Sequence, residues 1–327
     1  MILMGGRTIK HILIALPELN EGHRERLRAA GAGNDIRFVE ANEVAPADIE
    51  WAEVIVGNVP APLLHEPGKL EFYQLCSSGA DAYVAEGILD RRTILATCTG
   101  AYSQTVAEHA LASTLMLQKN LHLYRDAQRR HEWTDMGRVG TMEGAVVLVV
   151  GLGEIGCYYA RMAKALGAYV IGVKRRASEK PDYVDELYLT AQLDEVLGRA
   201  DVVMSVLPGS AATEHFYTAE RFRAMKRSCI FVNCGRGNAV AMDVLEQALR
   251  GGEIACAAVD VFEIEPLPAS SPLWDLDNLL VTPHASGFYH LPATVERMVD
   301  ICVKNLAAYL AGGELMNVVD FNTGYKK

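Results

Sequence analysis

Residues 146–156 constrain the fold of this chain more than any other stretch, because they read Val-Val-Leu-Val-Val-Gly-Leu-Gly-Glu-Ile-Gly. An apolar run of strand type leads into three glycines spaced as G-x-G-x-x-G, and a segment suited to a helix packed on a sheet follows. Gly151 permits a tight turn, Gly153 lets the backbone approach a pyrophosphate, and Gly156 lets helix and strand pack closely. The amino end of the helix offers N–H groups to the anion. The pattern predicts a dinucleotide site, and the alternative is an ordinary strand–helix turn with incidental glycines.

The second predicted strand of this unit, Tyr169–Val173, ends in three consecutive cations, Lys174, Arg175 and Arg176. A site for NAD usually has Asp or Glu at this point, where the carboxylate binds the ribose 2′-hydroxyl. No acid is present here to repel a 2′-phosphate, and up to three cations can pair with one. The sequence therefore predicts a preference for NADPH over NADH. The alternative is a basic loop that only contacts solvent.

Length and composition limit what the chain can be. With 327 residues, 50% of them hydrophobic, the chain is long enough for two domains with substantial cores. A formal net charge of −10 disfavours nucleic acid as a partner, and against that background the basic cluster at 174–176 stands out as an anion site. The 7 cysteines form no C-x-x-C pair, which favours a reducing compartment.

The sequence gives no sign of targeting to or across a membrane. Residues 1–14 include a short apolar strand, but they lack the long hydrophobic region and the cleavage site of a signal peptide. No apolar run reaches the length of a membrane span. We therefore predict a soluble cytoplasmic protein that binds neither metal, membrane nor nucleic acid.

The order of predicted elements indicates α/β architecture with parallel sheets. Strands predicted over residues 9–16, 36–40, 54–57 and 72–76 alternate with a helix over 20–30 and with helix-like or proline-rich segments. A long apolar helix over 105–123 is predicted to connect two domains, and a charged, irregular segment over 125–140 follows it. Further along the chain, strands are predicted over residues 201–207, 229–234, 255–261 and 279–282, and helices over 243–250 and 292–311.

Three polar residues follow predicted strands in the second half, where open α/β sheets place their ligands. Arg236 lies in Asn-Cys-Gly-Arg-Gly, Glu265 in Asp-Val-Phe-Glu-Ile-Glu-Pro-Leu-Pro, and His284 in Thr-Pro-His-Ala-Ser-Gly. Taken singly, each has an ordinary explanation: a structural arginine, a solvent-exposed glutamate, and a hydrogen-bonded histidine of the scaffold. Together they suit the reduction of a 2-oxo acid. An arginine holds a carboxylate and polarises a carbonyl, a histidine exchanges a proton with an alkoxide, and a glutamate orients the histidine.

These motifs, in this order and spacing, resemble those of the D-isomer-specific 2-hydroxyacid dehydrogenases. The resemblance extends from residue 75 to residue 318 and is strongest over 144–290. It implies that Arg236 binds the carboxylate and polarises the carbonyl, that Glu265 is the partner of the histidine, and that His284 is the acid/base. It also implies that Ser78 and Gly79 offer backbone N–H groups to the substrate carboxylate.

The resemblance implies further contacts to the cofactor. Asp260 is expected near the nicotinamide, while Pro208 and Thr213 are expected near the adenosine end. The full set of expected cofactor-binding residues is Gly151, Gly153, Glu154, Ile155, Gly156, Lys174, Arg175, Arg176, Leu207, Pro208, Thr213, Cys234, Gly235, Asp260 and Gly287.

The fold that the resemblance implies has two Rossmann-like or flavodoxin-like parallel-sheet domains with the active site in the cleft between them. Residues 1–101 and 288–327 are expected to form the substrate-binding domain, and residues 102–287 the dinucleotide-binding domain. A homodimer built around the second domain is also implied. Trp133 resembles an aromatic residue of the arm that reaches the partner subunit, although a simple core or interface anchor is an equal explanation. Glu108 and His109, on an apolar helix, are expected to be structural.

Some residues depart from the family pattern. Lys174 stands where NAD-using members have Asp, and the pair Ser77-Ser78 replaces a more usual apolar residue before Gly79. We expect no additional regulatory domain beyond residue 327, and this expectation disfavours the long, serine-regulated form of phosphoglycerate dehydrogenase.

The function expected from these features is NADP(H)-preferring reduction of a small 2-oxo acid such as glyoxylate or hydroxypyruvate, with NAD(H) possible. A larger 2-oxo acid fits the motifs equally well. Two alternatives remain at this point. One is a nucleotide-sensing interaction protein resembling the corepressors of this fold. The other is a phosphoglycerate-type or formate-type dehydrogenase that uses NAD.

Overall fold

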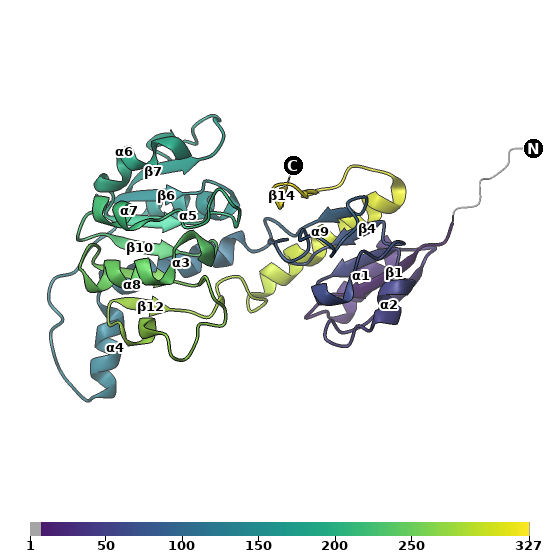
Figure 1. Ribbon diagram of the computed structural model, residues 1–327, viewed down its shortest axis with the longest axis horizontal. Helices are drawn as coiled ribbons and strands as arrows, with labels where there is room; N and C mark the ends of the chain where they lie inside the picture. The colour runs from purple at the N-terminus through teal and green to yellow at the C-terminus, as the bar shows by residue number, and fades with distance from the viewer. Residues whose placement is uncertain (1–7, 327) are drawn as a thin grey trace, which may run out of the picture. The chain divides into compact units, whose positions relative to one another are not determined.

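The computed structural model describes residues 8–326. Residues 1–7, which belong to the segment searched for a signal peptide, and residue 327 lie outside the described residues. The chain divides into two compact units. The first unit is formed by residues up to 102 together with those from 289 onward, and the second unit by residues 103–288. In Figure 1 the first unit is purple to blue and yellow, and the second is teal to green.

The first unit is built on a five-stranded parallel sheet with strand order β2-β1-β3-β4-β5. Its strands are β1 (His11–Ala15), β2 (Asp35–Phe38), β3 (Val54–Gly57), β4 (Phe72–Gln74) and β5 (Ile94–Ala96). Its helices are α1 (Glu21–Ala30), α2 (Pro46–Trp51), the short η1 (Ala61–Leu63) and the C-terminal α9 (Pro292–Ala311). A two-stranded antiparallel ribbon, β13 (Val319–Asp320) and β14 (Tyr325–Lys326), follows α9.

The inner strands β1 and β3 are apolar on both faces, as is usual where helices cover a parallel sheet on both sides, whereas the edge strand β2 has exposed Asp35 and Arg37. On one face Leu13, Ile55 and Tyr73 belong to a core that also includes Ile49 of α2. On the other face α9 packs beside α1 and over β4, and the rings of Phe72 and Tyr309 stack at 4.8 Å. The last helix of the chain therefore completes the domain that the first strands begin.

The second unit contains a seven-stranded parallel sheet with strand order β12-β11-β10-β9-β6-β7-β8. Its strands are β6 (Val146–Val150), β7 (Tyr169–Lys174), β8 (Glu186–Leu189), β9 (Val202–Ser205), β10 (Ile230–Asn233), β11 (Cys256–Val259) and β12 (Leu279–Val281). Its α-helices are α3 (Ser103–Gln118), α4 (Leu121–Arg129), α5 (Glu154–Ala165), α6 (Leu193–Val196), α7 (Ala219–Ala224) and α8 (Met242–Arg250). Short 3-10 helices cover Thr190–Gln192, Leu197–Arg199, Gly237–Ala239 and Pro272–Asp275.

Helices cover both faces of this second sheet (Figure 1). Helices α3 and α5 share one face, where the hydroxyls of Thr114 and Tyr159 lie 2.8 Å apart. Toward α7 and α8, on the other face, the rings of Tyr217, Phe222 and Phe231 form edge-on and tilted contacts. Strand order reverses at β6, which lies between β7 and β9. Such a switch point, at the carboxyl ends of the strands, is where open α/β sheets bind ligands.

The α/β fold with two parallel sheets is confirmed, and several elements keep their predicted bounds. One expectation is wrong. The single helix expected over 105–123 ends at Gln118, and a second helix, α4, occupies the start of the segment expected to be irregular. The break occurs at Asn120, which adopts φ 54°, a left-handed conformation that asparagine tolerates well. Its side-chain amide donates to the carbonyls of Met136 and Arg138 at 3.1 and 3.2 Å, and so anchors the loop that follows α4.

No helix in residues 8–326 is long and apolar enough to cross a bilayer.

Candidate active site

The glycine-rich turn has the geometry that its sequence predicts. Gly151 follows β6 with φ 108°, and a Cβ on Gly156 would lie 2.1 Å from the carbonyl oxygen of Gly151. Gly153 caps the start of α5 without a side chain, and nothing lies within 4 Å of the place where its Cβ would be. The amino end of a 12-residue helix is thus approachable by an anion such as a pyrophosphate. The loop fits a dinucleotide.

The predicted basic cluster lies beside this turn. The backbone N–H groups of Gly151 and Leu152 both donate to the carbonyl of Val173, which places the end of β7 next to the glycine loop. Lys174 is the last residue of β7, and its ammonium group donates to the hydroxyl of Ser178 at 2.7 Å. Arg175 and Arg176 are exposed. All three cations therefore lie just beyond the strand that borders the turn.

The loops after β9 and β10 lie against each other. A Cβ on Gly235 would come within 2.5 Å of the carbonyl oxygen of Leu207, so only glycine fits there. The hydroxyl of Thr213 donates to the carbonyl of Pro208 at 2.6 Å, which closes a turn within its own loop. Cys234 is buried, and burial raises the pKa of its thiol.

Glu265 and His284, which are 19 residues apart in the sequence, are paired in the structure. The Nδ1 atom of His284 lies 2.7 Å from Oε2 of Glu265. The second carboxylate oxygen of Glu265 accepts the backbone N–H of Phe262 at 2.9 Å, which fixes the orientation of the carboxylate. The imidazole is 50% exposed, and its Nε2 has no hydrogen-bond partner within the described chain. This geometry leaves Nε2 available to exchange a proton with a substrate.

The loop that carries His284 is held by a buried carboxylate. Asp260 is 2% exposed. One of its oxygens accepts the hydroxyl of Thr282 and the backbone N–H of Ala285, and the other accepts both the N–H and the hydroxyl of Ser286. His284 itself adopts φ 52° and donates its N–H to the backbone carbonyl of Asp260. Asp260 thus positions the histidine loop in this structure.

Arg236 leaves the sheet at the neighbouring strand, β10. The side-chain amide of Asn233 donates to the Arg236 carbonyl at 3.2 Å. A Cβ on Gly237 would lie 2.0 Å from the Phe262 backbone, so the arginine loop packs directly on the segment that leads to Glu265. The guanidinium donates to the carbonyl of Gly235 at 2.9 Å. Arg236, Glu265 and His284 therefore follow three adjacent strands, β10, β11 and β12, at the carboxyl edge of one sheet.

The predicted carboxylate-binding residues lie in the first unit, in the turn after β4. The backbone N–H groups of Ser78 and Gly79 donate no hydrogen bond to any acceptor in the described residues. Both residues are partly exposed. Two adjacent backbone N–H groups with no acceptor in the described residues can both donate to the two oxygens of a carboxylate.

Similarity to known proteins identifies the family of this chain. The family model described as "D-isomer specific 2-hydroxyacid dehydrogenase, NAD binding domain" matches residues 111–286. The chain belongs to the D-isomer-specific 2-hydroxyacid dehydrogenases. The resemblance inferred from the motifs is thereby confirmed, and the protein is an oxidoreductase of this family.

Several relatives of this dehydrogenase have curated names or solved structures. A glyoxylate/hydroxypyruvate reductase B of Klebsiella pneumoniae is 32% identical over 278 residues, which is 82% of this chain and 85% of the relative. A family member from Aeromonas salmonicida is 32% identical, with a TM-score of 0.85 over 96% of this chain and 100% of that chain. A member from Xanthobacter autotrophicus, solved with NADPH and MES, is 29% identical, with a TM-score of 0.80 over 97% of this chain and 100% of that chain.

The dehydrogenase has supporting residues that the sequence analysis did not identify. Thr282 bridges Asp260 and His109, since its hydroxyl lies 2.5 Å from Oδ1 of Asp260 and 3.2 Å from Nε2 of His109. Glu108, by contrast, accepts from Gln104 on the surface of α3. In the first unit, the side-chain oxygen of Asn58 accepts the N–H of Cys76 at 2.9 Å. The only sequence signal for Asn58 was its place directly after a predicted strand.

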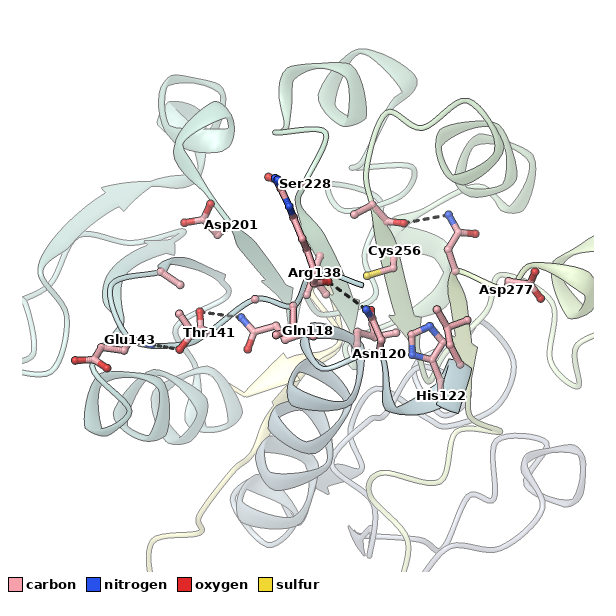
Figure 2. Close-up of a pocket in the computed structure, with 18 of the residues that line it drawn as sticks. Gln118, Asn120, His122, Arg138, Thr141, Glu143, Asp201, Ser228, Cys256 and Asp277 are labelled. Atoms are coloured by element: carbon pink, nitrogen blue, oxygen red, sulfur yellow. Dashed lines mark hydrogen bonds between the residues drawn. The ribbon is translucent and has the colours of Figure 1, made fainter. Parts of the chain in front are cut away.

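A cavity in the second unit lies away from the predicted site residues. Its volume is about 650 Å³, and it lies at the amino ends of the strands, the edge opposite the motifs. Figure 2 shows Gln118, Asn120 and His122, from the junction of α3 and α4, on one side of it, with Cys256 and Asp277 nearby. The dashed line from Gln118 to Thr141 is a 3.2 Å hydrogen bond that ties the end of α3 to the loop before β6.

Replacing Asp260 by asparagine should destabilise the dehydrogenase. An amide has one acceptor oxygen, so its NH₂ group would face two of the four donors that now bind the carboxylate. We expect a loss of about 3 kcal/mol in the free energy of unfolding, measured by urea denaturation. Asp275→Asn, an exposed aspartate on a 3-10 helix of the same unit, is the matched control. Equal stability of D260N and the parent protein would contradict the positioning role of Asp260.

Proposed function

We propose that this dehydrogenase reduces small 2-oxo acids, of the glyoxylate or hydroxypyruvate type, to D-2-hydroxy acids with NADPH. The observation that carries the proposal is the 2.7 Å pairing of His284 with Glu265 at the carboxyl edge of the nucleotide-type sheet. Names of curated relatives support it, since they are glyoxylate/hydroxypyruvate reductases. They favour this function over an interaction protein and over an NAD-dependent formate or phosphoglycerate dehydrogenase.

In the proposed reaction, the bound nicotinamide cofactor supplies the hydride. His284 donates the proton from Nε2 to the carbonyl oxygen, because negative charge develops there as the carbonyl is reduced. Glu265 holds the ring through Nδ1 and stabilises the imidazolium before the proton is given up. In the oxidative direction the same nitrogen takes the proton back.

We propose that Arg236 binds the substrate carboxylate and polarises the carbonyl, because a guanidinium offers two parallel donors. Ser78 and Gly79 are proposed to donate their backbone N–H groups to the same carboxylate. For the cofactor, we propose that Gly151, Gly153, Glu154, Ile155 and Gly156 bind the pyrophosphate side. Further along the site, Leu207, Pro208, Thr213, Cys234, Gly235, Asp260 and Gly287 are proposed to line it. By this proposal, residues 102–287 form the dinucleotide-binding domain, and residues 1–101 with 288–327 form the substrate-binding domain.

We propose NADP(H) as the preferred cofactor, with NAD(H) as a weaker one. Lys174, Arg175 and Arg176 supply positive charge beside the glycine turn, where a 2′-phosphate needs it. Solved family members include complexes with NADPH, from Xanthobacter autotrophicus, and with NADP, from Sinorhizobium meliloti.

Replacing Lys174 by aspartate should reverse the cofactor preference. The new carboxylate would accept from a ribose 2′-hydroxyl and repel a 2′-phosphate. We expect the ratio of kcat/KM for NADPH to that for NADH to fall by roughly 10²-fold, which corresponds to loss of one charged hydrogen bond and gain of one repulsion. Lys69→Asp, the same charge change at an exposed site in the first unit, should leave the ratio unchanged. An unaltered ratio in K174D would show that the basic cluster only contacts solvent.

The proposed activity is tested by following NADPH and NADH absorbance with a panel of 2-oxo acids. The panel runs from glyoxylate and hydroxypyruvate to pyruvate, phenylpyruvate and branched-chain oxo acids. Rapid NADPH oxidation with the small acids would support the proposal, and a preference for the large ones would correct the substrate class. Cofactor binding without oxidation by any member would contradict it.

We also propose a cytoplasmic homodimer. All seven cysteines are free thiols, which is typical of a reducing compartment. Trp133 is fully exposed in the segment that follows α4, and Leu121 and Tyr124 on α4 are also exposed. Large apolar side chains grouped on a surface are typical of an interface. Light scattering should give the mass of two chains, and the mass of one chain would contradict the proposed dimer.

A further inference from the structure

Hydrogen bonds to residues inside and outside the turn hold several backbone groups of the turn after β4, residues 76–79. The N–H of Cys76 and, more distantly, that of Ser77 donate to the side-chain oxygen of Asn58, at 2.9 and 3.4 Å. The carbonyl of Ser77 accepts the N–H of Cys98 at 2.8 Å, and the carbonyl of Gly79 accepts the hydroxyl of Ser77 at 2.7 Å. The N–H groups of Ser78 and Gly79 are the two in this turn that donate to no acceptor in residues 8–326.

The carbonyl of Cys76, at the start of the turn, accepts the phenolic hydroxyl of Tyr102 at 2.6 Å. Tyr102 is 7% exposed and belongs to the same unit as the turn. Its ring lies against that of Tyr289 in an edge-on contact, with centroids 6.2 Å apart. Burial raises the pKa of Tyr102, so its hydroxyl remains a hydrogen-bond donor across the physiological range. The same hydroxyl also lies 3.7 Å from the sulfur of Met298, which is a weak acceptor, so the carbonyl of Cys76 is its main partner.

We infer that Tyr102 is a positioning residue for substrate binding, and that Asn58 acts with it from the other side of the turn. Tyr102 fixes the carbonyl of Cys76 and Asn58 fixes its N–H, so the peptide planes that follow present the Ser78 and Gly79 N–H groups to a monocarboxylate. This inference rests on the proposed function, in which those two groups bind the carboxylate of the 2-oxo acid. Neither Tyr102 nor Asn58 touches the substrate in this scheme.

The physical reason lies in what each hydrogen bond constrains. A single turn of four residues has only a few soft dihedral angles, and each fixed carbonyl or N–H removes one of them. Without the Tyr102 hydroxyl, the buried carbonyl of Cys76 loses its partner and gains by rotating toward another donor. That rotation moves the next peptide planes, which weakens carboxylate binding while leaving the proton donor His284 untouched.

The test is Tyr102→Phe, which removes one oxygen and keeps the ring packing on Tyr289. We expect KM for the preferred 2-oxo acid to rise roughly tenfold, the effect of one buried hydrogen bond. The Kd of oxamate, a carboxylate whose amide carbonyl is not reduced, should rise by the same factor. The value of kcat and the Kd of NADPH should stay within about twofold, a split that general loss of structure would not give.

The matched control is Tyr289→Phe, because the hydroxyl of Tyr289 lies 3.4 Å from the Sγ atom of Cys76 and binds no backbone group of the turn in the described residues. It should change KM less than twofold. Asn58→Ala is the second variant, and it should raise KM and the oxamate Kd as Y102F does, so the test stands even where Y102F folds poorly. If the parent enzyme is active and KM is unchanged in both Y102F and N58A, this inference is overturned, while the proposed function stands. If the parent enzyme fails to oxidise NADPH with every 2-oxo acid of the panel, the proposed function is overturned instead.

Discussion

Replacing His284 by asparagine should lower kcat by a factor of about 10²–10⁴, the usual contribution of a general acid in place. Asparagine is the appropriate substitute because His284 has φ 52°, a conformation that asparagine adopts more readily than alanine. The variant should therefore keep the backbone of the loop, which Asp260 holds through Ala285 and Ser286. What it removes is the nitrogen that gives the proton to the developing alkoxide.

Steady-state NADPH oxidation at saturating 2-oxo acid measures this effect. The Kd of NADPH, measured by quenching of protein fluorescence, should stay within twofold, since the glycine turn lies on a different loop. His65→Asn, at an exposed histidine of the first unit that also has a positive φ, 34°, serves as the matched control and should retain full activity. Near-full turnover by H284N would show that another group supplies the proton, and the assigned mechanism would then be wrong.

Replacing Arg236 by alanine should affect substrate binding and the chemical step together. The guanidinium is proposed to make two charged hydrogen bonds, and losing both lowers kcat/KM by roughly 10²–10⁴. Because one bond is to the carboxylate and the other to the reacting carbonyl, we expect KM to rise and kcat to fall in the same variant. The loop itself should persist, since Asn233 and Gly237 hold it through backbone contacts that the side chain does not make.

The informative comparison for this second prediction is Arg236→Lys. Lysine keeps the charge but cannot place two parallel donors, so it should recover part of KM and little of kcat. Full recovery by R236K would mean that the arginine acts as a point charge only. A change of less than threefold in kcat/KM for R236A would remove Arg236 from the site altogether.

Much of the candidate site could be predicted because local sequence patterns indicate its residues. A parallel strand that ends in G-x-G-x-x-G specifies its own turn, so the positions of Gly151 and Gly156 follow from steric limits that act within a few residues. The cations after β7 and the three polar residues after β10, β11 and β12 were placed by the rule that parallel strands share a carboxyl edge. The structure adds the hydrogen bond between the side chains of His284 and Glu265.

The residues whose roles were not predicted act through contacts between segments that are far apart in the sequence. Asn58 and Tyr102 hold a turn that lies 18 and 26 residues away from them, and nothing near either residue in the sequence indicates this. Asp260 was predicted to contact the cofactor, while its four hydrogen bonds to the loop after β12 depend on the folded sheet. The break at Asn120 was missed because the apolar periodicity continues through it, and its side-chain anchor lies in a loop that has no pattern.

The arrangement of the chain also sets the order in which the protein can be completed at the ribosome. The strands of the first unit are synthesised first, yet the helix that covers one face of their sheet, α9, is synthesised nearly last. Until then Phe72 lacks the ring of Tyr309, and the places of the buried Met298, Cys302 and Leu306 are empty. The second unit comes from one continuous segment, residues 103–288, so its sheet needs no helix from a later part of the chain. One face of the first sheet therefore stays uncovered until α9 has been synthesised, and exposed apolar surface of this kind is prone to aggregation.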